Sequence, residues 1–444
     1  MPLHYPIHEQ TLPNGLRVVV SPDHTVPIVT VNLWVGVGSR HEAPGKTGFA
    51  HLFEHLMFQG SRSVASGEHF AALMAHGGRA NATTWFDRTN YFETVPAGAL
   101  ELALWLEADR HGHLLEAVTQ ENLDNQRDVV KEEKRQRYDN QPYGNALNDL
   151  YAAVFPADHP YHHPTIGSME DLDAASLEDV HEFFTRYYAP NNTVLTLVGD
   201  VTAERGFALA AEYLGHLDRQ VVPPRGPGPQ LAPISEDVRV TRRGAVPNDR
   251  LYLGFRMPAE GSVEYLAASL ALESAAGLSS SPMVSRLVRR EQVATSIGSH
   301  TMGFVDGSSL GLLVADIAPG QDAQQVGAEI ATELAHFVER GSTEDLIESV
   351  RAQAERSWLS ALASGEERAD IISHYTLLHD DPGYLNTALD QLLSITPEQV
   401  HDAAATWLAP SSAGWIGYLT GAEDGVEGGC DDEALVAATG EARA

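Results

Sequence analysis

The fold is decided by a stretch that occurs twice: Ser176-Leu177-Glu178-Asp179-Val180-His181 and, 220 residues later, Thr396-Pro397-Glu398-Gln399-Val400-His401. Each copy opens with a helix-capping signature, a hydroxyl residue followed three places on by a side chain that can bond back. Each helix then stops at the same Ala-Pro pair, residues 189–190 and 409–410, because proline cannot continue a helix. Two unrelated helix-to-strand joints are the alternative, but the matching spacing favours duplication of one unit of ~220 residues.

The duplication divides the chain near its middle. Apolar strands are expected after both Ala-Pro pairs, at 193–198 and 414–419. Between the copies lies a run rich in proline and glycine, which is typical of a stiff linker. We therefore expect an N-terminal domain over 1–220, a linker over 221–233, a second domain over 234–422 and an acidic tail over 423–444.

Within the halves, apolar periodicity predicts strands and helices in groups. Alternation from Val29 to Val37 indicates a strand with one buried face, and Thr47 can cap a short helix over 49–57. Grouping of elements, rather than strict alternation, predicts an α+β architecture. Further strands are expected at 16–20, 80–86 and 90–95, and helices at 99–110, 121–137, 321–340 and 343–362.

Composition excludes several classes of function. Of the 444 residues, 29 are Lys or Arg and 61 are Asp or Glu, a net charge of −32. Such a surface repels nucleic acid and anionic membranes, so neither is expected as a partner. No stretch approaches the ~20 apolar residues of a membrane span, and the first residues do not resemble a secretory signal. With Cys430 as its one cysteine, the chain is expected to be cytoplasmic.

Candidate chemistry lies in His51-Leu52-Phe53-Glu54-His55. Histidines four apart project from one face of a helix, so both imidazoles can reach one zinc ion. Glu54 lies beside them, where it can accept a proton from metal-bound water. This is the inverted form of the HExxH arrangement. The pattern also arises by chance in a chain with 20 histidines, so a third ligand is needed to support it.

The third ligand is sought on the helix expected over 121–137. Val129 and Val130 are taken as its inward face, and Glu133 follows them at helical spacing. Glu132 points about 100° away from Glu133. We therefore predict Glu133 as the carboxylate ligand, with one coordination position left open for water.

Together these motifs resemble the M16 (pitrilysin-type, inverzincin) zinc metallopeptidases, in particular the M16B branch that includes the mitochondrial processing peptidase and bacterial homologues. The resemblance implies two homologous lobes, each a mostly antiparallel sheet with helices packed on it. It implies one zinc ion per chain, held by His51, His55 and Glu133, with Glu54 as general base. Further matching stretches are Gly77–Thr84, His159–Tyr161, Thr165–Gly167 and Tyr188–Asn192.

The resemblance also implies a substrate and a partner. The family's Asn-Ala strand, here Asn81-Ala82-Thr83-Thr84 with Asn81, Ala82 and Thr83 as the substrate-binding residues, lies on an exposed sheet edge beside the metal, where an extended peptide adds as a strand. Active one-chain members carry an arginine and, seven residues later, a tyrosine in the second half. Here those places hold Val288 and Thr295, and a one-residue slip of the match would recover Arg289 but no tyrosine. The implied function is a zinc endopeptidase, the catalytic subunit of a pair whose homologous partner lacks the zinc motif but supplies the missing arginine and tyrosine.

Four other features of the sequence allow different interpretations. A non-catalytic assembly or binding subunit would normally have lost the zinc motif, and a structural zinc would have a fourth protein ligand. Gly45-Lys46-Thr47 resembles the end of a phosphate-binding loop but lacks the required upstream glycine. His159, His162 and His163 lack regular ligand spacing. Gln126 stands where the family often has a glutamate, which weakens any supporting role at that position.

Overall fold

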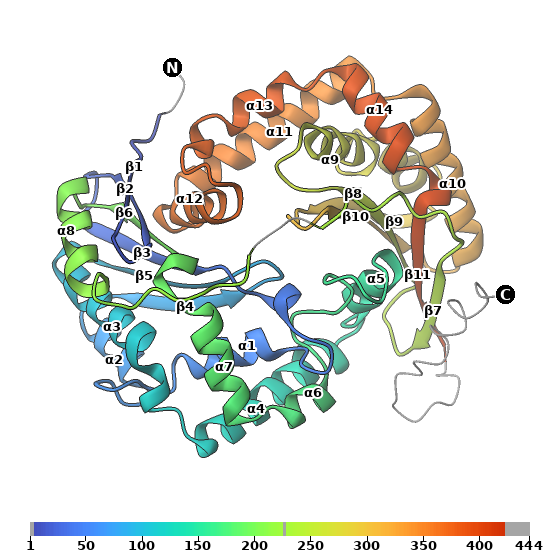
Figure 1. The fold of residues 1–444 in the computed structure, drawn as a ribbon. Coiled ribbons are helices and arrows are strands. Elements are labelled where there is room, and N and C mark those ends of the chain that lie inside the picture. Colours follow the sequence, from blue (N-terminus) through green and yellow to red (C-terminus); the bar gives the residue numbers. More distant parts are fainter. Residues whose placement is uncertain (1–3, 225–227, 422–444) are drawn as a thin grey trace.

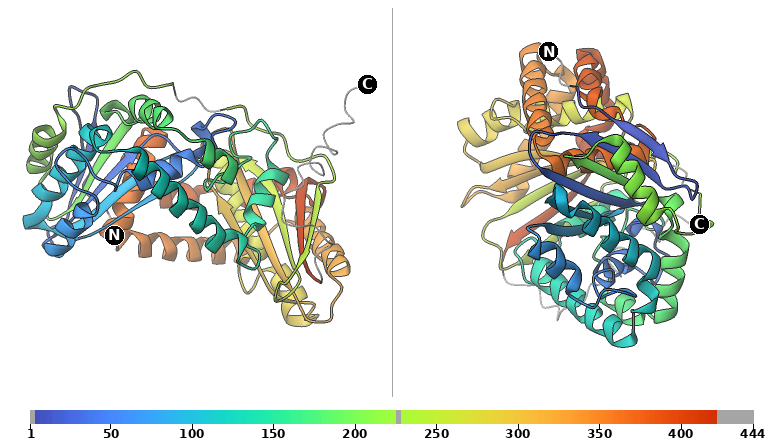
Figure 2. Two further views of the ribbon diagram at one scale, coloured as in Figure 1. Left: turned by 90° about the horizontal axis from the view of Figure 1, so that it is seen from below. Right: turned by 90° about the vertical axis from the view of Figure 1, so that its left-hand side faces the viewer.

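The computed structural model describes residues 4–224 and 228–421. The expected acidic tail, with Cys430, lies outside the described residues. Two lobes are visible in Figures 1 and 2, a blue-to-green half beside a yellow-to-red half. No helix within the described ranges is both long and apolar enough to cross a membrane.

The first lobe is built on a six-stranded sheet of order β1-β2-β6-β3-β5-β4. All its neighbouring strands are antiparallel except β2 and β6, which run parallel. Strand β4 is therefore an edge strand. The strands are β1 (His8–Thr11), β2 (Arg17–Pro22), β3 (Ile28–Val35), β4 (Arg79–Thr84), β5 (Thr89–Pro96) and β6 (Thr193–Gly199).

The second lobe repeats this plan. Its sheet has the order β7-β11-β8-β10-β9, with one parallel pair, β7 and β11. Strand for strand this matches β2-β6-β3-β5-β4, including the position of the parallel pair, so the expected two-lobe α+β fold is confirmed. The strands are β7 (Arg239–Gly244), β8 (Arg250–Pro258), β9 (Ala294–Met302), β10 (Ser308–Ile317) and β11 (Ala413–Thr420).

Helices surround both sheets. Both repeated helices, α7 and α14, begin with the expected capping boxes. The α-helices are α1 (Phe49–Leu56), α2 (Glu68–Ala75), α3 (Leu100–His113), α4 (Gln120–Lys134), α5 (Ala146–Val154), α6 (Met169–Ala174), α7 (Leu177–Tyr187), α8 (Ala203–Leu214), α9 (Val263–Ala276), α10 (Ala323–Arg340), α11 (Glu344–Leu362), α12 (Gly365–His379), α13 (Ala388–Ser394) and α14 (Pro397–Trp407). The helix expected over 121–137 ends its α-helical part at Lys134 and continues as a π-helical segment, Arg135–Asp139.

The two lobes exchange helices. Helix α12, from the second half, packs on β3 and β6 of the first sheet, while α5, from the first half, packs on β8 and β11 of the second. The fit is close, because a Cβ on Gly254 of β8 would lie 2.5 Å from the Val154 side chain of α5. Each sheet is therefore covered partly by a helix from the other half of the sequence.

This exchange corrects the expectation for the strand around Val29–Val37. Alternation predicted one buried face, but β3 is buried on both, including Thr30, Asn32 and Trp34. The polar side of the strand lies under α12, where Trp34 Nε1 donates to the Asp370 carboxylate at 3.0 Å.

Candidate metal centre

Helix α1 carries both histidines of the motif, and its first turn is fixed by packing. Gly48, at the N-cap, has a φ of 86°, in the left-handed region that favours glycine. A Cβ there would also lie 2.6 Å from the carbonyl oxygen of Ile166. The expectation that Thr47 caps this helix is wrong, because the Thr47 hydroxyl instead donates to Asp171 at 2.6 Å.

Glu42 satisfies the open amides of α1 instead. Its carboxylate accepts hydrogen bonds from the backbone amides of Gly48 and Ala50, at 2.9 and 2.7 Å. The Glu42 side chain is fully buried, and His163 Nε2 lies 3.0 Å from it. A carboxylate at a helix N-terminus is favoured by both hydrogen bonding and the helix dipole.

The helical period then orients the motif. One side of α1 is buried in the core of the first lobe through Phe49, Leu52, Phe53 and Leu56. His51 and His55 lie one turn apart, with ring centroids separated by 4.8 Å. Both imidazoles are partly exposed and face a cavity.

Helix α4 presents Glu133 to the same cavity. Val130 is fully buried, as expected, but Val129 is 42% exposed, so its assignment to the inward face was wrong. Glu133 lies three residues after the buried Val130, and residues three apart share one face of a helix. Glu132 is exposed and bonds Gln136, away from the histidines.

The three predicted ligands converge. Glu133 Oε2 lies 3.4 Å from His55 Nε2 and 3.8 Å from His51 Nε2. Zinc bonds of 2.0–2.2 Å at tetrahedral angles place ligand atoms about 3.4 Å apart. Two imidazole nitrogens and one carboxylate oxygen at this spacing therefore fit a zinc ion, and the three protein groups leave a coordination position open.

Electrostatics suit metal binding. Burial, and then the neighbouring His55, lower the pKa of His51 to about 4, so its imidazole is neutral at pH 7, the form that binds metal. A hydrogen bond with His55 helps to lower the pKa of Glu133. The other Glu133 oxygen, Oε1, pairs with the exposed Arg137 at 2.7 Å, which leaves Oε2 directed at the histidines.

Glu54 lies beside the cluster but outside it. The Thr84 hydroxyl donates a hydrogen bond to Glu54 Oε2 at 2.5 Å. The other carboxylate oxygen, Oε1, does not take part in this bond. Burial raises the pKa of Glu54 above its ordinary value. A carboxylate with a raised pKa is a better proton acceptor near neutral pH.

The predicted substrate strand borders the same cavity. Asn81, Ala82 and Thr83 lie on edge strand β4, and the Asn81 side chain accepts a hydrogen bond from the Ala82 amide at 2.9 Å. Asn81 and Thr83 are exposed, while the Ala82 side chain is buried. All seven predicted site residues line one cavity of about 470 Å³.

Comparison with known proteins supports the same family. The model of "Insulinase (Peptidase family M16)" matches residues 17–167, and the model of "Peptidase M16 inactive domain" matches residues 174–354. A zinc protease of Mycobacterium leprae is 31% identical over 405 residues, covering 89% of this chain and 87% of that protein. The chain belongs to peptidase family M16.

Other M16 relatives agree in fold and extent. The zinc protease PqqE of Helicobacter pylori is 29% identical over 421 residues, covering 91% of this chain and 92% of the relative. The crystal structure of a protease from Helicobacter pylori superposes with a TM-score of 0.85 at 27% identity, covering 94% of this chain and all of that one. An M16 inactive-domain structure from Pseudomonas fluorescens, at 17% identity, has a TM-score of 0.83, covers 95% of this chain and all of that one, and shows the shared fold.

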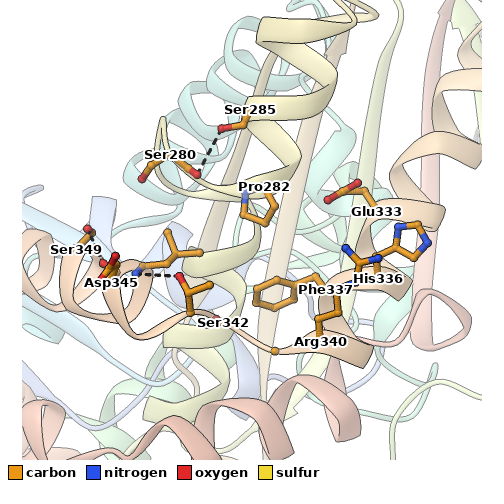
Figure 3. Close-up of a pocket in the computed structure, with 13 residues that line it drawn as sticks. Ser280, Pro282, Ser285, Glu333, His336, Phe337, Arg340, Ser342, Asp345 and Ser349 are labelled. Atoms are coloured by element: carbon orange, nitrogen blue, oxygen red, sulfur yellow. Dashed lines mark hydrogen bonds between the residues drawn. The ribbon is translucent and has the colours of Figure 1, made fainter.

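Other candidate residues of this M16 chain lie elsewhere. His162 Nδ1 contacts the carbonyl of Phe155 at 2.8 Å, and His163 contacts Glu42. Figure 3 shows a separate pocket of about 490 Å³ in the second lobe, between the end of α10 and the start of α11. Its labelled residues include Glu333, His336 and Asp345, and none of the residues lining it belongs to the M16 motif.

Sequence reasoning missed three supporting residues. Arg137 follows Glu133 by four positions, so helical spacing alone could have identified it. Thr84 is the last residue of the predicted substrate strand, but nothing in its spacing indicates contact with Glu54. Glu42 acts across a loop and has no local signal as the cap of α1.

Proposed function

We propose that the chain is a zinc-dependent endopeptidase that hydrolyses extended peptides or unfolded segments. One observation carries the proposal: two imidazoles and a carboxylate converge at zinc-ligand spacing, with Glu54 beside them and a free sheet edge along the same cavity. Metal, proton acceptor and peptide-binding edge are the three parts that peptide hydrolysis needs.

Each protein group has a distinct task. Zinc, when bound, would polarise the scissile carbonyl and lower the pKa of water. His51, His55 and Glu133 would hold it. Glu54 would accept a proton from water and deliver it to the leaving amine, and the Thr84 hydroxyl would keep the Glu54 carboxyl oriented. A buried carboxyl whose pKa is raised suits both directions of that transfer.

Substrate would bind by strand addition to β4. An edge strand offers unpaired amides and carbonyls to an incoming peptide with little dependence on its sequence. Asn81 Oδ1 bonds the Ala82 amide in the free chain, so it would have to move aside or join the new hydrogen bonds. Extended, unstructured peptides are therefore the expected substrates.

We further propose that this is the catalytic subunit of a heterodimer of the M16B type. Valine and threonine cannot replace a guanidinium and a phenol as donors to the substrate. In addition, Val288 packs against the core of the second lobe, and the Thr295 hydroxyl donates to the Asp316 carbonyl. Arg289, which a one-residue slip would bring to the arginine position, is exposed, but Ser296 stands seven residues after it and offers no phenol. The nearby Arg286 pairs with three carboxylates on its own lobe. Those carboxylates belong to Glu291, Glu329 and Glu333.

The test compares Glu54→Gln with Glu132→Gln, using zinc-loaded protein and an unstructured peptide, with and without the homologous chain. Glu54→Gln should keep zinc and lose roughly 10²–10⁴-fold in turnover, because an amide cannot accept the proton. The exposed Glu132→Gln control should behave as wild type. Turnover of Glu54→Gln within threefold of wild type would remove Glu54 from this role. If the zinc-loaded wild type cleaves no peptide both with and without the homologous chain, the result would instead favour a non-catalytic binding subunit.

A further inference from the structure

Outside the M16 centre, a second group of side chains has the geometry of a metal site. Glu260 lies between β8 and α9, and His374 and His379 lie on α12. Glu260 Oε2 is 3.1 Å from His374 Nε2 and 3.7 Å from His379 Nε2. These distances resemble those at the first centre, where Glu133 Oε2 lies 3.4 Å from His55 Nε2 and 3.8 Å from His51 Nε2.

None of these three atoms is otherwise satisfied. Glu260 Oε2, His374 Nε2 and His379 Nε2 are buried and have no hydrogen-bond partner of acceptable geometry. Among the residues that the structure describes, no lysine or arginine pairs with the Glu260 carboxylate. Buried polar atoms without partners are costly, so their convergence on one point calls for an ion between them.

Packing holds the three side chains in this arrangement. A Cβ on Gly303 would lie 2.7 Å from the Glu260 carboxyl carbon, and one on Gly261 would lie 2.8 Å from the His379 ring. The His374 ring meets Trp34 of β3 edge-on, with centroids 5.6 Å apart. The ligand groups are therefore positioned by glycines and an aromatic ring that leave them little freedom.

A third cluster shows what a site without a metal looks like. His69, Glu93 and Glu107 are also close together and buried. There the Arg110 guanidinium pairs with both carboxylates, Glu93 at 3.6 Å and Glu107 more closely. A side-chain cation already occupies that position, whereas the Glu260 cluster has none.

We propose that Glu260, His374 and His379 bind a divalent transition-metal ion of the zinc type. Two imidazoles and one carboxylate match the ligand preference of zinc, with water completing the sphere. Because α12 packs on the first sheet and Glu260 belongs to the second lobe, the ion would fasten the two lobes together. It would raise the metal capacity of the chain from one ion to two.

The alternative is a metal-free ion pair. Burial alone would lower the pKa of His374, but the Glu260 carboxylate raises it above the ordinary value. A protonated His374 could then pair with Glu260 directly. Metal must displace that proton, so the two interpretations differ in the amount of metal bound.

The experiment counts bound metal in the full-length chain. Protein is stripped with chelator, saturated with Zn²⁺, dialysed and measured by mass spectrometry. Wild type should hold two ions, and both His374→Ala and the His51→Ala/His55→Ala double variant should hold one. His300→Ala, which alters an exposed histidine on β9, should hold two.

Two further readouts keep the test decisive. Co²⁺ bound to the His51→Ala/His55→Ala chain should give a visible absorption band, and Zn²⁺ should slow hydrogen exchange in α12 of that chain. If His374→Ala does not fold, Glu260→Gln, which preserves shape, replaces it. No ion in the His51→Ala/His55→Ala chain, or the same metal content in His374→Ala as in wild type, would overturn the proposal. Because that double variant lacks the M16 ligands, its result is independent of whether the chain is a peptidase.

Discussion

Glu42→Ala should loosen α1, the helix that carries the predicted zinc ligands His51 and His55. The substitution removes the acceptor for the Gly48 and Ala50 amides, at 2.9 and 2.7 Å, and leaves them buried without partners. Hydrogen bonds to charged groups are worth about 1.5–3 kcal/mol each. The two bonds together contribute about 3–6 kcal/mol. The substitution also removes the desolvation cost of burying the Glu42 carboxylate, so we expect a net loss of unfolding free energy near the lower value, about 3 kcal/mol.

The same loss should appear in zinc affinity. If the first turn of α1 frays in the free protein and must order when zinc binds, about 3 kcal/mol corresponds to a dissociation constant roughly 10²-fold higher. Glu42→Gln keeps one acceptor oxygen and should lose about half as much free energy.

Urea unfolding of chelator-treated protein and zinc titration against a coloured chelator measure the two effects. Glu212→Ala, an exposed glutamate on α8, is the matched control. A Glu42→Ala chain with unchanged unfolding free energy and a zinc dissociation constant within threefold of wild type would refute the reasoning.

Other expected outcomes follow from the same geometry. Glu133→Ala should lower metal content by one ion while Glu132→Ala leaves it unchanged, and the reverse result would overturn the ligand assignment. Gly48→Ala should destabilise the chain by several kcal/mol, roughly 2–4, because it combines an unfavourable φ with a clash; an unchanged melting temperature would contradict this. Chelator should abolish peptide cleavage, and added Zn²⁺ should restore it. Purified alone, the chain should cleave peptides slowly, and a homologous subunit carrying the missing donors should raise turnover ~10²–10³-fold; full activity without it would exclude the heterodimer.

The features that the sequence predicted are those encoded by local spacing. The paired capping boxes of α7 and α14 marked the duplication, and the four-residue spacing of His51 and His55 placed both on one face of a helix. Glu133 followed from the period of its own helix, although Val129 was assigned to the wrong side. Each of these features depends on residues within a few turns of one another.

Features that depend on distant partners could not be predicted in this way. The cap of α1 comes from Glu42 across a loop, and Thr47, the nearer candidate, bonds Asp171 instead. The exchange of α5 and α12 leaves no mark in either helix, because an amphipathic face shows that something is covered but not what covers it. The polar side of β3 is buried because α12 covers it, and the sequence of the strand gives no sign of that cover.

The exchanged helices also determine when each lobe can be completed during synthesis on the ribosome. The first sheet is finished at Gly199, but α12 begins at Gly365, 166 residues later. At ~5–20 residues per second, the first sheet waits roughly 8–33 s for its cover. Helix α5 waits longer, because β11 is the last strand made. A nascent chain therefore exposes one face of the first sheet and one unpaired helix until it is nearly complete, and neither half can reach its final packing before the other has been largely translated.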